Sequence, residues 1–158
     1  MSSKPFPWKC SACHEREVTL ANVHYVATVE HDGRPYDLRI DGLQIPKCRN
    51  CGKLVMTEQV NQKISDALRK AAHLLTPAQI RKKRDALGLT QKQLAAYLQV
   101  ADATLSRWET GAQIQQRSLD RFMRLFFEVP EARAYLDCSV ASRSPARQKL
   151  PAALAKNA

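Results

Sequence analysis

Residues 90–111, with the sequence TQKQLAAYLQVADATLSRWETG, decide the fold of the C-terminal half of this chain. The stretch opens with a capping box, in which the Thr90 hydroxyl and the Gln93 side chain each satisfy a free amide of the first helical turn. Apolar side chains then recur at helical spacing. A second short helix is predicted over residues 102–109 and stops at Gly111. The stretch therefore predicts two short helices joined by a tight turn.

Further helices are predicted on both sides of this pair. Thr76 followed by Pro77 is a helix cap with proline at the first helical position, and Gly88 ends that helix. Residues 116–128 are rich in phenylalanine and leucine and predict a longer helix, after which Pro130 begins a last short one. The segment from Pro77 onward is therefore predicted to be entirely helical.

The N-terminal segment, residues 10–57, has a different pattern, with β-branched and aromatic residues dense from Val18 to Val29. Asp32-Gly33 predicts a hairpin turn, because glycine adopts positive φ at no steric cost. Asp41-Gly42 predicts a second turn, leading into a short third strand at 43–45. Two or three short strands bury little apolar surface, so this segment needs a staple.

Four cysteines are the candidates for such a crosslink. Cys10 and Cys13 form one C-x2-C unit, Cys48 and Cys51 form a second, and 34 residues separate the two. Each unit lets two thiolates reach one ion from a tight turn, and two units complete a tetrahedral S4 site. We expect a structural Zn²⁺, since four thiolates leave no open position for catalysis.

Other uses of these cysteines are less consistent with the sequence. Two disulfides conflict with a reducing compartment, and a redox pair needs only one C-x2-C unit. Cys10-x-x-Cys13-His14 also matches the haem attachment string, which would leave the second pair without a role. An iron–sulfur cluster uses the same ligands and stays open. The fifth cysteine, Cys138, is expected to pack as a small buried residue.

The chain has 158 residues and a formal net charge of +10. Residues 139–158 carry 4 basic and 0 acidic side chains, and we expect them to form a flexible basic tail. Residues 77–138 carry 10 basic and 7 acidic side chains, net +3. The basic run Arg81–Arg84 lies here, and a helix can turn only one of its sides to phosphates. A basic excess indicates a polyanionic partner without naming it.

Composition also excludes several classes. No run of about 18 apolar residues is present, so we expect no membrane span and no membrane partner. The N-terminus lacks the apolar core of a secretion signal, which favours a cytoplasmic protein. Glycine is scarce, with 5 residues, and no Ser/His/Asp or paired-carboxylate pattern stands out. We therefore expect that the protein is not an enzyme.

Together these patterns predict an α+β protein in four segments. A zinc-binding β-rich module occupies residues 1–57, and a helix with a linker occupies residues 58–76. In that helix Thr57 is the cap and apolar residues recur at spacings of three and four. A helical domain fills residues 77–138, and the tail follows at 139–158.

The stretch 90–111 resembles the Xre-type, phage-repressor-like helix-turn-helix. The match includes a small residue at Ala95 where the helices approach and Val100 in the turn. In the second helix, Leu105 and Trp108 are expected to face inward, which leaves the opposite face for DNA. A helical interaction domain without a DNA role is the alternative reading.

The resemblance implies a set of DNA-contacting residues. Gln91 would contact a phosphate oxygen at the start of the first motif helix. The exposed face of the second helix would include Arg107, whose guanidinium pairs bidentately with guanine. Asp102 would cap that helix, since Ala101 stands where a serine cap is usual. The full set is Gln91, Lys92, Asp102, Ala103, Ser106 and Arg107.

The succession of the two modules is similar to the MqsA-type (YgiT-type) zinc-finger antitoxins, over about residues 8–136. This resemblance implies a type II antitoxin that binds a small toxin through its zinc module and represses its own operon. A homodimer is expected through residues 116–136, because Phe122, Phe126, Phe127 and Leu136 supply more apolar surface than short helices bury. It would read a palindromic operator in double-stranded DNA.

Two other functions stay open. One is a stand-alone zinc-finger and helix-turn-helix regulator, for instance of a mobile element, without a toxin partner. The other is a metal-assisted enzyme, which would need an open coordination position on the metal. We further expect Cys48→Ser to unfold the N-terminal module and to leave DNA binding largely intact.

Overall fold

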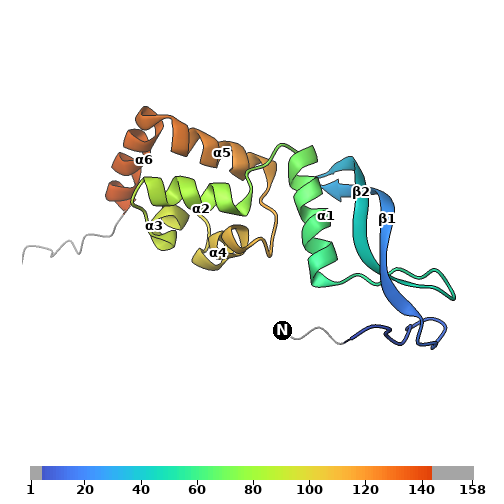
Figure 1. Cartoon of the computed structure of the whole chain (residues 1–158). Helices are drawn as coiled ribbons and strands as arrows, with labels where there is room; N and C mark the ends of the chain where they lie inside the picture. Colours follow the sequence, from blue (N-terminus) through green and yellow to red (C-terminus); the bar gives the residue numbers. More distant parts are fainter. Residues whose placement is uncertain (1–4, 144–158) are drawn as a thin grey trace, which may run out of the picture.

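The computed structural model describes the backbone of residues 5–143 and the side chains of residues 5–136. Over residues 5–143, a two-stranded antiparallel hairpin is followed by six helices, which confirms the α+β prediction. Figure 1 shows the hairpin at one end of the molecule, α1 beside it, and the other helices beyond α1. The elements are β1 (Val18–His31), β2 (Arg34–Cys48), α1 (Glu58–Ala71), α2 (Pro77–Ala86), α3 (Gln91–Leu98), α4 (Asp102–Thr110), α5 (Arg117–Glu128) and α6 (Pro130–Arg143).

The hairpin turns at Asp32-Gly33 as predicted, with φ of 56° and 69°. The second predicted turn is wrong. Val23 pairs with Leu43 and Tyr25 with Ile40, so Asp41-Gly42 faces the single residue between Val23 and Tyr25. The dipeptide therefore forms a β-bulge within one continuous strand, and the predicted third strand is the end of β2. Turn and bulge both use a glycine with positive φ, which is 64° at Gly42.

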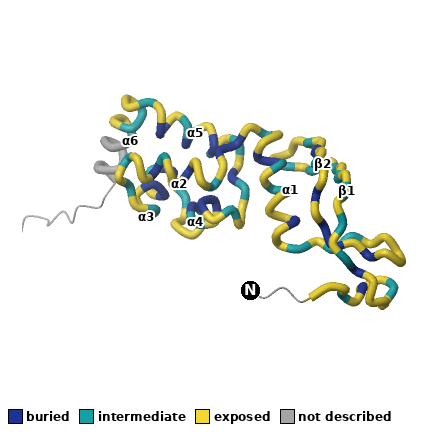
Figure 2. Tube along the Cα trace, in the orientation of Figure 1, coloured by how far each residue is buried: buried dark blue, intermediate teal, exposed yellow. Residues whose placement is uncertain are grey.

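One face of the hairpin packs against α1. Leu43 and Ile45 of β2 are buried together with Val60 of α1. Thr57 begins α1, accepting a hydrogen bond from the Val60 amide at 3.3 Å. The opposite face is open, and Figure 2 shows exposed positions alternating along both strands. Because the hairpin has a helix on only one side, its stability depends on α1 and on the cysteine end.

The helices from α2 onward share one apolar core. It contains the buried residues Leu75, Ile80, Leu94, Ala95, Leu98, Leu105, Trp108, Met123, Phe126 and Phe127. The predicted capping box at Thr90 with Gln93 is present. The predicted cap at Thr76 is also present, and Gln79 completes a capping box there. Local capping signals thus begin α2 and α3, and this core packs them against α4 and α5.

The same core corrects the argument for a dimer. Phe126 and Phe127 lie inside the core of one chain rather than on its surface, because α3 and α6 pack against α5. The exposed apolar side chains here are instead Leu125 at 48 % and Tyr135 at 77 %. α6 continues to Arg143, five residues into the segment predicted as a tail. Residues 144–158 and the Cys138 side chain lie outside the described residues.

Within residues 5–143, no helix is both long enough and apolar enough to cross a membrane.

Candidate metal centre and nucleic-acid interface

The four cysteines are held in two turns of matching geometry. In the first turn the His14 amide donates to the Cys10 carbonyl at 3.1 Å, and in the second the Gly52 amide donates to the Cys48 carbonyl at 2.9 Å. The residue after each second cysteine is left-handed, with φ of 64° at His14 and 74° at Gly52. Each C-x2-C unit therefore turns both thiols to one side.

The thiols of the two turns converge. All four Sγ atoms lie within 4.8 Å of one another. Two cross-turn contacts, Cys10 with Cys51 and Cys13 with Cys48, are each 3.6 Å. A tetrahedral Zn²⁺ with Zn–S bonds of about 2.3 Å requires sulfur atoms about 3.8 Å apart. The donor set and its spacing therefore fit one four-coordinate metal ion, with the first turn and the second each supplying two ligands.

The charges in this cluster also favour a cation. Amide hydrogen bonds from Cys13 and Ala12 lower the pKa of Cys10 to about 6. A hydrogen bond from the Lys53 amide lowers the pKa of Cys51, but partial desolvation and the three neighbouring thiols outweigh it and raise that pKa to about 11. Four thiolates this close repel one another, and a divalent ion removes that repulsion.

The cysteine cluster is joined to the hairpin by backbone pairing. Trp8 pairs with Val18 at the start of β1, and the Arg49 amide donates to the Glu17 carbonyl at 2.9 Å. Val18 and Cys48, which face each other across the sheet, are fully buried beside Cys10. No role was predicted for residues 5–8, yet through Trp8 this segment closes the cysteine end of the module.

The predicted helix-turn-helix is formed by α3 and α4. Ala95 is completely buried where the two helices meet, and Leu105 and Trp108 turn the inner face of α4 into the core. Val100 packs against the same core from the turn. Each of these four positions agrees with the prediction from sequence.

The candidate DNA-contacting residues lie mostly on the outer surface of α3 and α4. Asp102, Ala103 and Arg107 are exposed, and Ser106 is half-buried between them. Lys92 is exposed at the start of α3, whereas Gln91 donates to a Glu109 carboxylate oxygen at 2.8 Å. α4 thus presents one polar face around Arg107.

The start of α4 differs from the prediction. Ala101 is the N-cap, and within the described part of the chain no side chain caps this helix by a hydrogen bond. Asp102 follows as the first helical residue, so its carboxylate lies beside the positive end of the helix dipole. The expected cap at Asp102 is therefore replaced by a weaker electrostatic contribution.

A buried ion pair behind this surface was missed by the sequence analysis. Glu109 is 2 % exposed and accepts from Arg84 Nε at 2.6 Å and from Arg84 Nη2 at 3.0 Å. Its pKa is raised by burial, but the hydrogen bonds from Arg84 and Gln91 and the nearby positive charges lower it below its ordinary value. The pair joins α2 to α4. Its sequence signal is weak, because Arg84 is one residue in a run of basic residues and nothing in that run marks it as the buried one.

The basic run on α2 has mixed roles as a result. Arg84 is buried, and Arg81 donates to the Glu109 carbonyl at 3.0 Å. Lys83 pairs with Glu128 at 3.2 Å, and Lys82 is exposed. Most of this run therefore stabilises the domain rather than forming a continuous basic surface.

Comparison with known proteins agrees with this geometry. Residues 80–132 match the Helix-turn-helix family model. No curated protein matches the chain. The match begins within α2 and ends within α6, so it spans the buried ion pair, the polar face of α4 and the shared core. Residues 80–132 are thus an Xre-type helix-turn-helix domain, which makes this chain a DNA-binding transcriptional regulator with a possible four-cysteine metal site.

Proposed function

We propose that this protein is a repressor that acts as a type II antitoxin and regulates its own operon. The observation that carries the proposal is the presence, in one chain, of a four-cysteine module and a helix-turn-helix domain. This pair of modules is similar to the MqsA-type antitoxins. The bound metal is Zn²⁺ in a structural role, and the protein is a cytoplasmic DNA-binding protein, not an enzyme.

The DNA-binding part of the proposal assigns readout to α4. Arg107 contacts guanine, and Ser106, Ala103 and Asp102 lie against neighbouring positions in the major groove. Lys92 and Gln91 contact phosphates from the start of α3. The exposure of Arg107 and Lys92 supports these assignments.

We further propose a homodimer that reads a palindromic operator. Among the described residues of α5 and α6, Leu125 and Tyr135 are large apolar side chains that are exposed, and they replace the buried phenylalanines as candidate interface residues. In a two-fold dimer these two helices would pack against their copies, and the α4 helices would enter successive major grooves.

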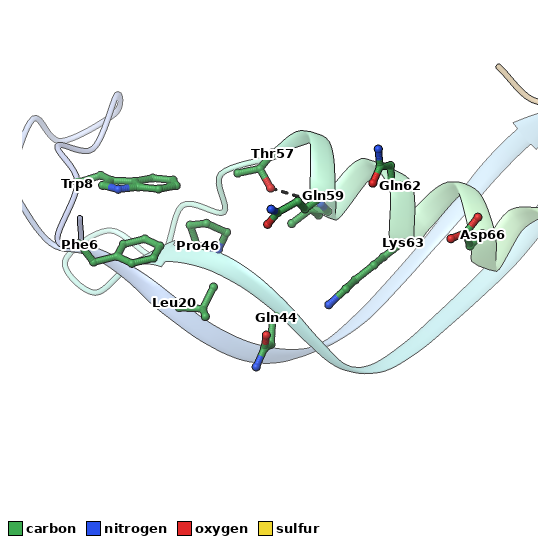
Figure 3. A pocket seen from close by; sticks show the side chains of 11 residues that line it. Phe6, Trp8, Leu20, Gln44, Pro46, Thr57, Gln59, Gln62, Lys63 and Asp66 are labelled. Carbon is green, nitrogen blue, oxygen red and sulfur yellow. Dashed lines mark hydrogen bonds between the residues drawn. The ribbon is translucent and has the colours of Figure 1, made fainter. Parts of the chain in front are cut away.

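The toxin would bind the N-terminal module. A groove of about 450 Å³ lies between the start of the chain, the hairpin and α1, and Figure 3 shows the side chains that line it. Phe6 and Trp8 stack at one end with ring centres 4.4 Å apart, and the exposed side chain of Leu20 continues the apolar surface. An apolar groove with polar side chains along α1 supports a protein partner here.

Two binding experiments test the proposal. Purified protein should shift DNA from its own promoter more strongly than random DNA of equal length. It should also co-purify with the product of the adjacent gene when both are co-expressed, and suppress that product's toxicity. Promoter binding without a toxic neighbour would favour a stand-alone regulator, and failure of both experiments would refute the proposal.

A further inference from the structure

Residues 111–117, which run from the end of α4 to the first residue of α5, are held by α1 and by the hairpin. On one side lies Arg69 of α1, which is 2 % exposed although it carries a charge. Its Nη2 donates to the carbonyls of Gly111 at 3.1 Å and Gln113 at 3.3 Å. Its Nη1 donates to Asp66 at 3.0 Å. A buried guanidinium thus binds the carbonyl at which α4 ends.

On the other side lies the tip of the hairpin. His31 Nε2 is 3.2 Å from the carbonyl oxygen of Gln115. The Arg117 amide donates to the Asp32 carboxylate at 2.9 Å, across 85 residues of sequence. Within residues 5–136, the Gln116 N-cap makes no side-chain hydrogen bond to α5. Asp32 therefore caps α5 from a different module.

The segment that follows α1 completes this contact. Gln115 is buried and donates from Nε2 to the Leu75 carbonyl at 2.6 Å and to Asp120 at 3.0 Å. The Leu75 amide donates to the same Asp120 oxygen at 2.7 Å. In Figure 1 the loop from α4 passes beside the end of α1 on its way to α5. The loop is therefore bound along its length rather than free.

We propose that Arg69 and Asp32 are positioning residues for DNA recognition. By holding residues 111–117 from two sides, they set the orientation of α4, so the state of the N-terminal module governs how well the protein distinguishes its operator from other DNA. Arg69 also places a positive charge at the carbonyl end of α4, where the helix dipole favours it. This inference rests on the proposed role of α4 in DNA readout.

The Asp32 contact provides the sharper test. Asp32→Gly removes the carboxylate while suiting the positive φ of 56° at this position, so the hairpin turn is retained. Asp32→Asn keeps an acceptor oxygen and also tolerates this conformation. In hydrogen-exchange mass spectrometry of the full chain, peptides that contain the Arg117 amide should exchange faster in Asp32→Gly and return toward wild type in Asp32→Asn. Glu30→Gln, an exposed charge change on the same hairpin, is the control.

The Arg69 contact is tested with a matched neighbour. Arg69→Gln should lower the ratio of operator affinity to random-DNA affinity by roughly three- to tenfold. Lys70→Gln removes the same charge from an exposed position on α1 and should leave the ratio unchanged. Metal content is measured in each variant to show that the cysteine cluster is retained. If Arg69→Gln loses its metal or unfolds, the Asp32 pair carries the test alone.

The outcomes separate the two levels of the argument. If wild-type protein binds promoter DNA, but Asp32→Gly changes neither the exchange of residues 111–117 nor the affinity ratio, the positioning role is overturned. If wild-type protein binds no promoter DNA, the proposed function itself fails. Faster exchange with a lower ratio in Asp32→Gly, rescued by Asp32→Asn, supports the positioning role.

Discussion

Arg107 combines exposure with a supported position on α4. Its neighbours on the inner face of the helix, Leu105 and Trp108, are fixed in the core, so the path of the Arg107 side chain away from the domain is set by the helix itself. Ala103 adds only a methyl group to the same outer face. Direct base readout should therefore depend strongly on Arg107.

Arg107→Ala should weaken operator binding by about 1–3 kcal/mol and relax specificity at one base position. The reason is that a bidentate contact with guanine is lost while the phosphate contacts remain. Fluorescence anisotropy with a panel of single-base operator variants measures both effects. Arg39→Ala, an exposed arginine on β2, is the control, and equal operator affinity in both variants would remove Arg107 from the readout.

Glu109 and Arg84 illustrate how a single buried pair supports this surface. Removing either residue would leave the other as a buried charge without its partner. Such a removal lowers the free energy of unfolding by about 3–5 kcal/mol. Gln91 is fixed by the same carboxylate. The pair thus connects domain stability to the position of a candidate phosphate contact.

The lowered pKa of Glu109 predicts a pH dependence of stability. A carboxyl group whose pKa is lower in the folded state stabilises the fold above its unfolded pKa, and this contribution is lost as the pH falls through the folded pKa. The ordinary value is 4.5, so the loss should occur below about that pH. Urea denaturation of wild type and Glu109→Gln at pH 7 and pH 4 checks this. The difference in free energy of unfolding between wild type and Glu109→Gln should be smaller at pH 4 than at pH 7. An equal difference at both pH values would contradict this prediction.

Among the elements, the turn between α3 and α4 contains an unusual residue. Gln99 ends α3 in the left-handed region, with φ of 56°. A side chain with a Cβ atom is disfavoured there by about 1–2 kcal/mol, whereas glycine is not. Both flanking helices are packed in the core, so the strain is maintained by the surrounding structure.

Gln99→Gly should therefore stabilise the domain by about 0.5–1 kcal/mol, after allowing for the greater freedom of glycine in the unfolded chain. Thermal denaturation followed by circular dichroism measures the change. Gln113→Gly, in the loop after α4, is the comparison. A lower unfolding temperature in Gln99→Gly than in wild type would contradict this prediction. It would show that contacts of the Gln99 side chain stabilise the fold by more than the backbone strain destabilises it.

Local signals explain which elements could be predicted from sequence. Thr90 with Gln93 and Thr76 with Gln79 form capping boxes within four residues, and the structure confirms both helix starts. Asp41-Gly42 also carries a correct local signal, a glycine with positive φ, but a turn and a bulge share it. The choice between them is made by pairing with β1, which is not local in sequence.

At the scale of the whole molecule, the contact between modules could not be predicted for the same reason. Arg69 is a residue type typical of an exposed helix position. Nothing in the sequence around it indicates that its partners are carbonyls 42 and 44 residues away. Asp32 is equally explained as a turn residue. The convergence of the four thiols, by contrast, could be predicted from chemistry, because two C-x2-C units together supply the four thiolates of one tetrahedral site.

The contacts of Asp32 and Arg69 also change what should follow from loss of the metal. The sequence alone favoured independent modules, with Cys48→Ser leaving DNA binding largely intact. In the structure the hairpin caps α5 through Asp32, and α1 binds the end of α4 through Arg69. The hairpin in turn depends on the cysteine end, where Val18 and Cys48 are buried together, and on its packing against α1.

Cys48→Ser should therefore lose the metal and also weaken operator binding, by roughly three- to tenfold. The proposed structural zinc would contribute about 10–16 kcal/mol, the range for small zinc modules, so we expect the hairpin to lose its structure without it. The helical domain keeps its own core of residues from α2 to α5 and should stay folded, which circular dichroism can check. Metal analysis and anisotropy titrations give the two readouts, with Cys138→Ser as the matched thiol control. Loss of metal with unchanged operator affinity would restore the independence of the modules. Loss of both, with retained helical content, would support coupling between the cysteine site and DNA binding.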